Sequence, residues 1–373
     1  MRILHVLNDC RKIGNGIINV AVDLVCTQSQ AGLTVAVASR GGEYEALMKQ
    51  YRVQHFYLDQ RRNPIQIFKA ILNFRRIIEQ FKPDVVHVHM MTGAVIAYVC
   101  KFEGKGYALV STLHNEYARA SILMGLADRL IAVSLPVAES ISRRRVPQQK
   151  IRVVSNGTIG TPRQPALSET EPMPLKRPAI TTVAGMFYRK GIAELIEAFV
   201  QIADANPDAH LYLVGDGADR AVFERQAAIA FCADRIHFEG FQPEPQRYLL
   251  STDIFVLASS REPFGLVLSE AREAGCAIVA SEVDGTPEAL EGGKAGLLVP
   301  PKDVSALSMA LSSLLNSPTQ LECWKQAAQK NLEWLKIDRV HQETLAVYKD
   351  ATTQRFGSGH QRPDSSSMRL EEE

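Results

Sequence analysis

The sequence predicts an α/β protein built from two doubly wound, mostly parallel sheets. Three observations lead to this prediction. The chain has 373 residues, more than a single hydrophobic core usually serves. Short apolar, β-branched runs alternate with helix-length segments along most of its length. A polar stretch from Thr161 to Pro178 contains five prolines and interrupts that alternation, which indicates a linker between two domains.

Strand-like runs and helical segments alternate through the first half of the chain. The helical segments include 17–31 and 64–82. Parallel strands joined by helices bury both faces of their sheet. We therefore expect residues 1–165 to form an N-terminal Rossmann-like domain, followed by a linker at 166–178. The expected strands of this domain are 3–7, 34–38, 55–58, 85–88, 108–113, 130–133 and 151–154.

The second half repeats the alternation, with helices that include 193–206 and 304–315. Residues 179–336 are expected to form a C-terminal Rossmann-like domain that faces the first across a ligand-binding cleft. We expect a helix at 337–357 to pack back on the N-terminal domain, and the Ser-, Pro- and charge-rich segment 358–373 to be a disordered tail. The expected strands are 180–184, 210–214, 236–238, 253–258, 277–281 and 296–299.

The composition is that of an ordinary globular protein. Hydrophobic residues make up 46% and charged residues 22% of the chain. The first residues resemble a strand rather than a signal peptide, and the longest mostly apolar run, 90–100, is far below the roughly 18 residues that a membrane span needs. The six cysteines are scattered, without metal-ligand or redox spacing. We therefore expect a cytoplasmic protein.

The net charge of +1 hides an asymmetry between the two halves. Residues 1–160 contain 21 Lys and Arg against 11 Asp and Glu, whereas residues 161–373 contain 21 against 30. A basic N-terminal half suits an acidic acceptor or an anionic membrane surface. Nucleic acid is disfavoured, because no basic stretch is interleaved with aromatic residues.

The helical segment 64–82 offers one route to a membrane. It combines basic residues with a stripe of apolar residues: Ile67, Ile71, Phe74 and Ile78. Such a helix usually packs on its own sheet, but Arg143 to Arg145 add a further basic cluster. Peripheral contact with the inner face of the cell membrane is therefore a second hypothesis.

The stretch 259–271 lies between two apolar, β-branched runs and predicts the loop and helix of a strand-helix-strand unit. Ser259 or Ser260 is expected to cap the helix. The unpaired N–H groups at such a helix start bind anions such as a diphosphate. Glu262 and Glu270 either border that ligand or lie as solvated side chains on a surface helix.

The run from Glu262 to Leu266, with Glu270, resembles the E-x7-E signature of the retaining nucleotide-sugar glycosyltransferases of family four, which have the GT-B fold. The resemblance implies a hexosyltransferase-type enzyme. No metal-ligand cluster is visible in the sequence, so we expect it to be metal-independent and without cofactors. It would move a sugar from a nucleotide diphosphate sugar to a glycan or lipid-linked hydroxyl, in polysaccharide or glycolipid biosynthesis. Further pieces match in the family's order: Gly14-Asn15-Gly16, His114-Asn115, Ser155-Asn156-Gly157, Arg189-Lys190-Gly191, Gly215-Asp216-Gly217 and Gly285-Thr286-Pro287-Glu288.

The resemblance implies a catalytic set. Arg189 and Lys190 would neutralise the departing diphosphate, and Glu262 would lie by the sugar or its phosphate side. His114 would contact the transferred sugar. The chain departs from the family's pattern at Met186, where the family often has arginine, so either Arg189 replaces that guanidinium or activity is reduced.

The resemblance also implies donor contacts. Glu270 would accept hydrogen bonds from the ribose hydroxyls, because an ionised carboxylate is a strong acceptor for a vicinal diol. The loop that includes Gly16 would lie beside the reacting sugar and the acceptor, on the N-terminal domain. The other expected donor-binding residues are Phe264, Gly265, Leu266 and Gly215.

Two other functions are open at this point. A glycoside hydrolase would use Glu262 and Glu270 as acid and nucleophile, which requires a carboxyl separation that the sequence does not give. A catalytically silent nucleotide-sugar-binding protein would account for Met186. His87 and His89 share one face of a predicted strand, but two ligands make a poor metal site, so we expect no metal.

Overall fold

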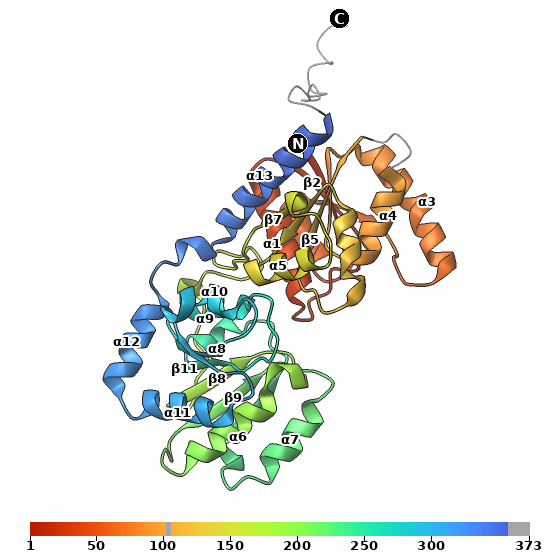
Figure 1. Ribbon diagram of the computed structural model, residues 1–373. Coiled ribbons are helices and arrows are strands. Elements are labelled where there is room, and N and C mark those ends of the chain that lie inside the picture. The colour runs from red at the N-terminus through yellow and green to blue at the C-terminus, as the bar shows by residue number, and fades with distance from the viewer. Residues whose placement is uncertain (102–105, 357–373) are drawn as a thin grey trace, which may run out of the picture.

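The computed structural model describes residues 1–101 and 106–356. They form two α/β domains, one above the other in Figure 1, each built around one parallel sheet. The first sheet has seven strands in the order β3-β2-β1-β4-β5-β6-β7, and the second has six in the order β10-β9-β8-β11-β12-β13. The predicted fold class is confirmed. The predicted tail 358–373 lies outside the described residues.

The N-terminal sheet is buried on both faces because neighbouring residues of a strand point to opposite sides. In β1, Leu4 packs with Phe74 and other residues of α3 and α4, whereas Ile3 packs with Val347 of α13. The strands are β1 Arg2–Val6, β2 Thr34–Ser39, β3 Gln54–Tyr57, β4 Val85–Val88, β5 Ala108–Leu113, β6 Arg129–Ala132 and β7 Ile151–Val153. The helices between them are α1 Gly16–Gln30, α2 Glu45–Gln50, α3 Pro64–Phe81, α4 Met91–Lys101 and α5 Leu135–Arg143.

The C-terminal sheet is built in the same way. Val256 of β11 packs toward α6 and α11, and its neighbour Phe255 packs toward α9. The strands are β8 Ala179–Val183, β9 His210–Val214, β10 Ile236–Gly240, β11 Ile254–Leu257, β12 Ala277–Ser281 and β13 Leu297–Val299. The helices are α6 Ile192–Ala203, α7 Arg220–Ala228, α8 Gln246–Leu249, α9 Leu266–Glu273, α10 Thr286–Ala289, α11 Val304–Leu315 and α12 Pro318–Ala328.

The last helix, α13 (Ile337–Phe356), crosses back to the N-terminal domain, where it packs against α1, β5 and β6 (Figure 1). Two arginines of the N-terminal sheet hold its far end. Arg129 Nε and Arg152 Nη2 each lie 2.7 Å from a carboxylate oxygen of Asp350. The chain therefore returns to the domain in which it began. No helix in the described part of the chain is both long and apolar enough to cross a membrane.

Polar contacts join the two domains on one side of the gap between them. Ser134 Oγ donates to the carbonyl of Pro263 at 2.7 Å, and the amide of Leu135 donates to Glu288 Oε2 at 2.9 Å. The Arg261 guanidinium reaches Glu116 across the same boundary at 2.7 Å. These contacts fix the loops at the carboxyl ends of both sheets close to one another.

Candidate active site

A cleft of about 620 Å³ lies between the domains, where the carboxyl ends of β1, β5, β8, β9 and β11 face each other. Parallel sheets place ligand-binding loops at this end of their strands. The structure brings all ten residues that the sequence singled out into this one cleft. They are Gly16, His114, Arg189, Lys190, Gly215, Glu262, Phe264, Gly265, Leu266 and Glu270.

The loop after β1 forms the N-terminal side of the cleft. Asn15 ends this loop and caps α1, since its side chain accepts a hydrogen bond from the amide of Ile17 at 3.0 Å. A Cβ atom on Gly16 would lie only 3.0 Å from Cδ1 of Leu266 in the other domain. A glycine here therefore lets the start of α1 approach the start of α9.

The start of α9 differs from the prediction. Neither Ser259 nor Ser260 caps it: Ser259 Oγ lies 3.3 Å from Glu262, and Ser260 Oγ donates to the carbonyl of Arg189 at 3.2 Å. The N-cap is Gly265, in the left-handed region (φ 84°), with no side-chain cap. The amide of Leu268 donates to the carbonyl of Gly265 at 2.9 Å, whereas the amides of Leu266 and Val267 begin the helix without a capping side chain, and this end of the helix lines the cleft.

Lys190 and Glu262 form an ion pair in the cleft, with Lys190 Nζ 2.5 Å from Glu262 Oε2. Both side chains are largely buried, at 15% and 12% exposed. The contact depends on Gly191, whose φ of 69° lets the loop turn into α6. Any Cβ atom at that position would lie 1.9 Å from the carbonyl oxygen of Ala258. Close backbone packing between β8 and β11 thus positions this ammonium group.

Arg189 is more exposed than Lys190, and aromatic rings hold it. Its guanidinium carbon lies 5.8 Å from the ring centroid of Tyr117 and 5.7 Å from that of Phe187. Met186, where the family often has arginine, is completely buried in the core of the C-terminal domain. Met186 is therefore a packing residue, and Arg189 is the guanidinium that reaches the cleft from this loop.

Glu270 lies one turn inside α9, and its carboxylate has no hydrogen-bond partner among the described residues. Burial raises the pKa of Glu270 to about 7, against the opposing charge of Arg163. Arg163 itself is bound in a two-pronged ion pair to Asp23 of α1, at 2.6 and 2.9 Å. No sequence pattern predicts this pair, because Arg163 lies in the proline-rich stretch and its position differs from that of Asp23 by 140 residues.

A row of hydrogen-bonded side chains lies behind His114. His114 Nε2 is 3.1 Å from His89 Nδ1, His89 Nε2 is 3.0 Å from His5 Nδ1, and His5 Nε2 is 2.9 Å from Gln28 Oε1. Burial lowers the pKa of His5 to about 4 and of His114 to about 3, and it lowers that of His89 well below the ordinary value. The three rings are therefore neutral near neutral pH, with one ring proton each.

The orientation of the Gln28 amide fixes where those protons lie. Its oxygen can only accept, so His5 carries its proton on Nε2 and accepts at Nδ1. His89 therefore donates from Nε2 to His5 and accepts at Nδ1. The donor to His89 Nδ1 is His114, so the proton of His114 lies on Nε2. Nδ1 of His114 is then left as a hydrogen-bond acceptor for a ligand hydroxyl in the cleft.

Three histidines, not two, meet behind the cleft. The pairing of β1 with β4 sets His5 opposite His87, and one ring nitrogen from each of His5, His87 and His89 lies within 4.8 Å of the other two. That spacing suits a metal ion, but every one of these nitrogens already has a protein partner. His87 bonds Tyr348 at 2.6 Å and Thr112 at 2.7 Å, so the network accounts for the cluster without an ion.

Two family models match the chain, one on each domain. The model described as Glycosyltransferase Family 4 matches residues 14–158, and the model described as Glycosyl transferases group 1 matches residues 164–331. The boundary between them falls at the start of the proline-rich stretch.

Curated relatives match most of the chain. The lipopolysaccharide core biosynthesis glycosyltransferase LpsE of Rhizobium meliloti is 27% identical over 297 residues, which cover 76% of this chain and 83% of the relative. The N-acetyl-alpha-D-glucosaminyl L-malate synthase of Bacillus anthracis is 24% identical over 293 residues, covering 72% of this chain and 74% of the relative.

Solved structures share the architecture over almost the whole chain. Anabaena Alr3699/HepE in complex with UDP superposes with a TM-score of 0.79 at 17% identity, covering 94% of this chain and 100% of that one. WaaG, a glycosyltransferase involved in lipopolysaccharide biosynthesis, superposes with a TM-score of 0.71 at 15% identity, covering 95% and 100%. With a glycosyltransferase model on each domain and this architecture, the chain belongs to the glycosyltransferases of the GT-B fold.

Proposed function

We propose that this glycosyltransferase is a retaining, metal-independent enzyme that moves a hexose from a nucleotide diphosphate sugar to a glycan or lipid-linked hydroxyl. One observation carries the proposal: Lys190, Arg189, the open start of α9 and Glu270 converge in a single interdomain cleft. A diphosphate with a vicinal diol is the ligand that this combination of cations, N–H donors and a carboxylate fits. The complex of the Anabaena protein with UDP supports this class of ligand.

The donor would lie along the C-terminal side of the cleft. The ribose hydroxyls donate to Glu270, and the diphosphate lies between Lys190 and the first N–H groups of α9. When the donor binds, Lys190 weakens its ion pair with Glu262 and contacts the phosphate. Glu262 is thereby turned toward the sugar side, as the resemblance implies, rather than serving as a hydrolytic acid.

The reaction exchanges one bond to the anomeric carbon for another. The bond from C1 to the phosphate oxygen breaks, and the acceptor oxygen bonds C1 on the same face. The acceptor hydroxyl proton passes to the departing phosphate oxygen, so no metal or separate base is required. Lys190, Arg189 and the amides of α9 stabilise the negative charge that grows on the diphosphate.

His114 acts in this scheme as an uncharged hydrogen-bond acceptor. With its proton on Nε2, it accepts a hydrogen bond from a hydroxyl of the transferred sugar at Nδ1. Because burial lowers the pKa of His114 to about 3, the ring adds no positive charge beside the anomeric carbon. The sugar is held without a cation that would oppose charge development at C1.

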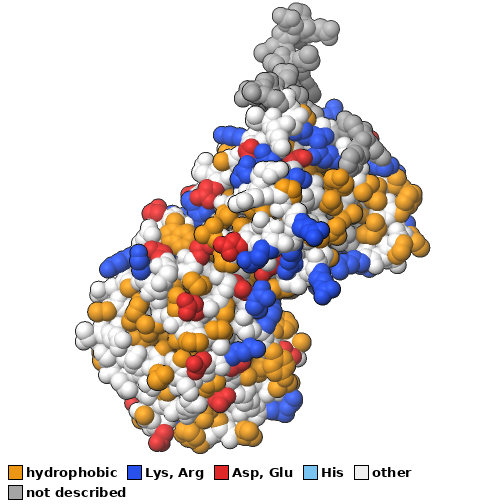
Figure 2. Space-filling model, in the orientation of Figure 1, with side chains coloured by type: hydrophobic (Ala, Val, Ile, Leu, Met, Phe, Trp, Pro, Cys, Tyr) orange, Lys and Arg blue, Asp and Glu red, His pale blue; other side chains and the backbone are white. Residues whose placement is uncertain are grey.

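Helix α3 supports peripheral contact with an anionic membrane. The apolar face formed by Phe74 and Ile78 is buried in the core, as expected of a helix that packs on its own sheet. A different stripe is exposed instead: Ile65 at 65%, Phe68 at 63% and Leu72 at 39%. Figure 2 shows hydrophobic side chains gathered over this end of the N-terminal domain, with Lys and Arg around them.

Vesicle co-sedimentation tests this contact. Binding to vesicles with anionic lipid should exceed binding to phosphatidylcholine alone, and Phe68→Ser should reduce it. Met309→Ser, which removes a similarly exposed apolar side chain from the other domain, is the matched control. Equal, weak binding to both kinds of vesicle would remove the membrane from the proposal.

The function itself is tested by a donor screen. Thermal shift with a panel of nucleotide sugars identifies the donor, and mass spectrometry with cell lipids and glycans identifies the product. NMR of the product's anomeric configuration decides between retention and inversion, and excess EDTA should leave the rate unchanged. Sugar release from a nucleotide-free glycoside, or binding without any transfer, would contradict the proposal.

A further inference from the structure

A second pocket opens on the N-terminal domain beside the cleft, with a volume of about 340 Å³. Its walls come from three loops at the carboxyl edge of the first sheet: Asp9 and Arg11 follow β1, Arg40 and Gly41 follow β2, and Tyr57 and Arg61 lie at and after the end of β3. The loop after β1 continues directly into Lys12 to Gly16, which line the cleft. We call the space lined by these six residues the arginine pocket. The arginine pocket and the acceptor side of the cleft therefore share one loop.

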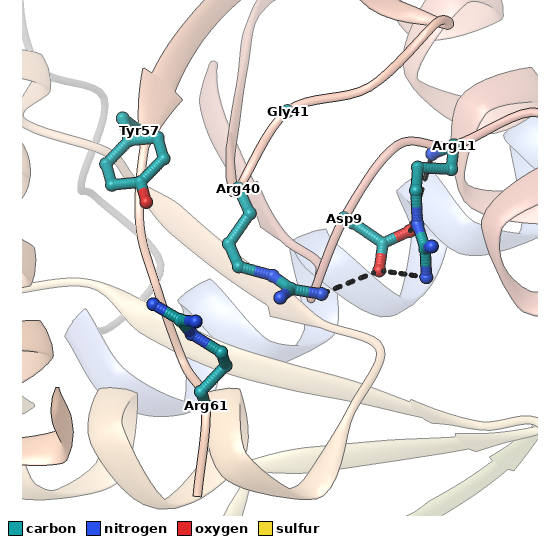
Figure 3. Close-up of a pocket in the computed structure, with 6 residues that line it drawn as sticks. All are labelled: Asp9, Arg11, Arg40, Gly41, Tyr57 and Arg61. Carbon is teal, nitrogen blue, oxygen red and sulfur yellow. Dashed lines mark hydrogen bonds and ion pairs between the residues drawn. The ribbon is translucent and has the colours of Figure 1, made fainter. Parts of the chain in front are cut away.

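The side chains of the arginine pocket are arranged around an open space. In Figure 3, Arg40, Arg61 and the Tyr57 hydroxyl turn toward that space, and Arg11 lies on the far side of Asp9. Asp9 is shared, with contacts of 3.2 Å both to Arg11 and to Arg40. Burial alone would raise the pKa of Asp9, but its hydrogen bonds to Arg11 and Arg40 lower it, so the carboxylate is ionised.

The charges of the arginine pocket do not balance. Among the side chains that line the pocket, three guanidinium groups meet one carboxylate, Asp9. From outside the lining, Asp59 pairs with Arg61 at 2.6 Å, and the charge of Glu43 acts on Arg11. Arg40 uses Nη2 on Asp9 and Nε on the carbonyl of Asn8, which leaves other N–H donors for a ligand. Phosphate and carboxylate groups match the planar fork of arginine better than any other common ligand group.

We propose that the arginine pocket binds an anionic group, a phosphate or carboxylate, carried by the acceptor substrate. The inference rests on the proposed function only in assigning the anion to the acceptor. The exposed ring of Tyr57 offers an apolar wall for a neighbouring sugar. The exposed stripe of α3 begins four residues after Arg61, so a phospholipid acceptor would meet both surfaces; a soluble phosphorylated glycan would use the pocket alone.

Titration with inorganic phosphate tests the pocket directly. Protein labelled with ¹⁵N at arginine side chains is followed by NMR, in which Arg40 and Arg61 report on the pocket and Arg189 reports on the cleft. We expect saturable shifts at Arg40 and Arg61. The Arg40→Gln, Arg61→Gln double variant lacks both reporters, so its affinity is followed at Arg11, which also lines the pocket, and should be about tenfold weaker. Arg143→Gln paired with Arg145→Gln removes the same charge from another part of the domain and should leave the affinity unchanged.

The outcomes separate the two proposals. Absence of a saturable shift at Arg40 and Arg61, or equal affinity in the pocket variant and the control, would overturn the arginine pocket while leaving the donor site intact. Failure of UDP to shift Arg189, with phosphate still bound at Arg40, would instead count against the proposed donor site alone.

Vesicle binding distinguishes the two possible sources of the anion, a lipid headgroup and a soluble acceptor. Phosphatidylcholine vesicles containing phosphatidic acid are compared for the wild type and the double variant. Lost vesicle binding together with lost phosphate binding assigns the pocket to a lipid headgroup. Unchanged vesicle binding together with lost phosphate binding assigns it to a phosphorylated soluble acceptor. Both results support an anion site.

Discussion

The two sides of the cleft use charge in opposite ways. The C-terminal side offers Lys190, Arg189 and an uncapped helix start. The N-terminal side offers His114, backed by a row of neutral rings whose pKa values burial has lowered. In the proposed reaction the donor's leaving group becomes negative, whereas positive charge develops at C1 of the sugar, and the hydroxyl groups that face His114 are uncharged. Each side carries the electrostatics that its proposed ligand needs.

The largest expected effect comes from removing a positive charge on the C-terminal side of the cleft. Lys190→Ala should lower kcat by about 10²–10³, roughly 3–4 kcal/mol of barrier, because it removes a preorganised cation from the departing diphosphate. Initial rates with saturating donor measure this. Lys294→Ala removes an exposed lysine from the same domain and should be silent. Wild-type rates in both Lys190→Ala and Glu270→Ala would show that the donor binds elsewhere.

The next largest effect comes from protonating the buried histidines on the N-terminal side of the cleft. The pKa of His5 falls from 6.5 when unfolded to about 4 in the fold, so the unfolded chain binds the proton first as pH drops. The free energy of unfolding should therefore fall between those two pH values, by about 1.4 kcal/mol per pH unit for each such histidine. Urea unfolding at several pH values measures the slope. His5→Asn should make it shallower, and an unchanged slope would mean that His5 titrates normally in the fold.

A smaller effect sharpens the comparison at Glu270. Its pKa is raised to about 7, so the free protein holds a proton there below that pH and must release it when the ribose hydroxyls bind. UDP affinity should fall as pH drops below about 7, by up to about tenfold per unit. Calorimetry in buffers of different ionisation enthalpy measures the released proton. Glu270→Gln should abolish the proton release from the protein, so that only protons released by UDP itself remain.

The smallest effect separates the two cations. Arg189 is exposed and stacked on Tyr117, whereas Lys190 is largely buried. Arg189→Lys keeps the charge but loses the planar stacking, which contributes about 0.5–1 kcal/mol at exposed sites. We expect kcat/KM to fall by about threefold. A loss as large as that of Lys190→Ala would show that the guanidinium shape is essential to catalysis.

The sequence was sufficient for the sheets and for most of the cleft. Alternating runs predict parallel strands, and the carboxyl ends of such strands lie together, so residues as distant as Gly16, Lys190 and Glu270 could be expected to share a site. The first turn of α9 was predicted less well. A serine cap was the favoured choice by residue type, but the backbone turns through Gly265 instead.

Features that depend on register or on long-range packing could not be predicted. His5 joins His87 and His89 only because β1 and β4 pair with His5 opposite His87. Arg163 reaches Asp23 only because the proline-rich stretch lies against α1. The periodicity of α3 predicted the face that packs on the sheet, because Phe74 and Ile78 are buried, but it did not single out the exposed residues Ile65 and Phe68.

The return of α13 to the first domain has a practical consequence. Tyr348 on this helix hydrogen-bonds both Gln28 and His87, so α13 completes the support of His114. The N-terminal domain is therefore not a continuous piece of sequence. A fragment ending at residue 165 would lack one layer of its core, whereas a circular permutant that places 337–356 before residue 1 would keep it. Dissection of this enzyme into separately expressed halves should follow the second design.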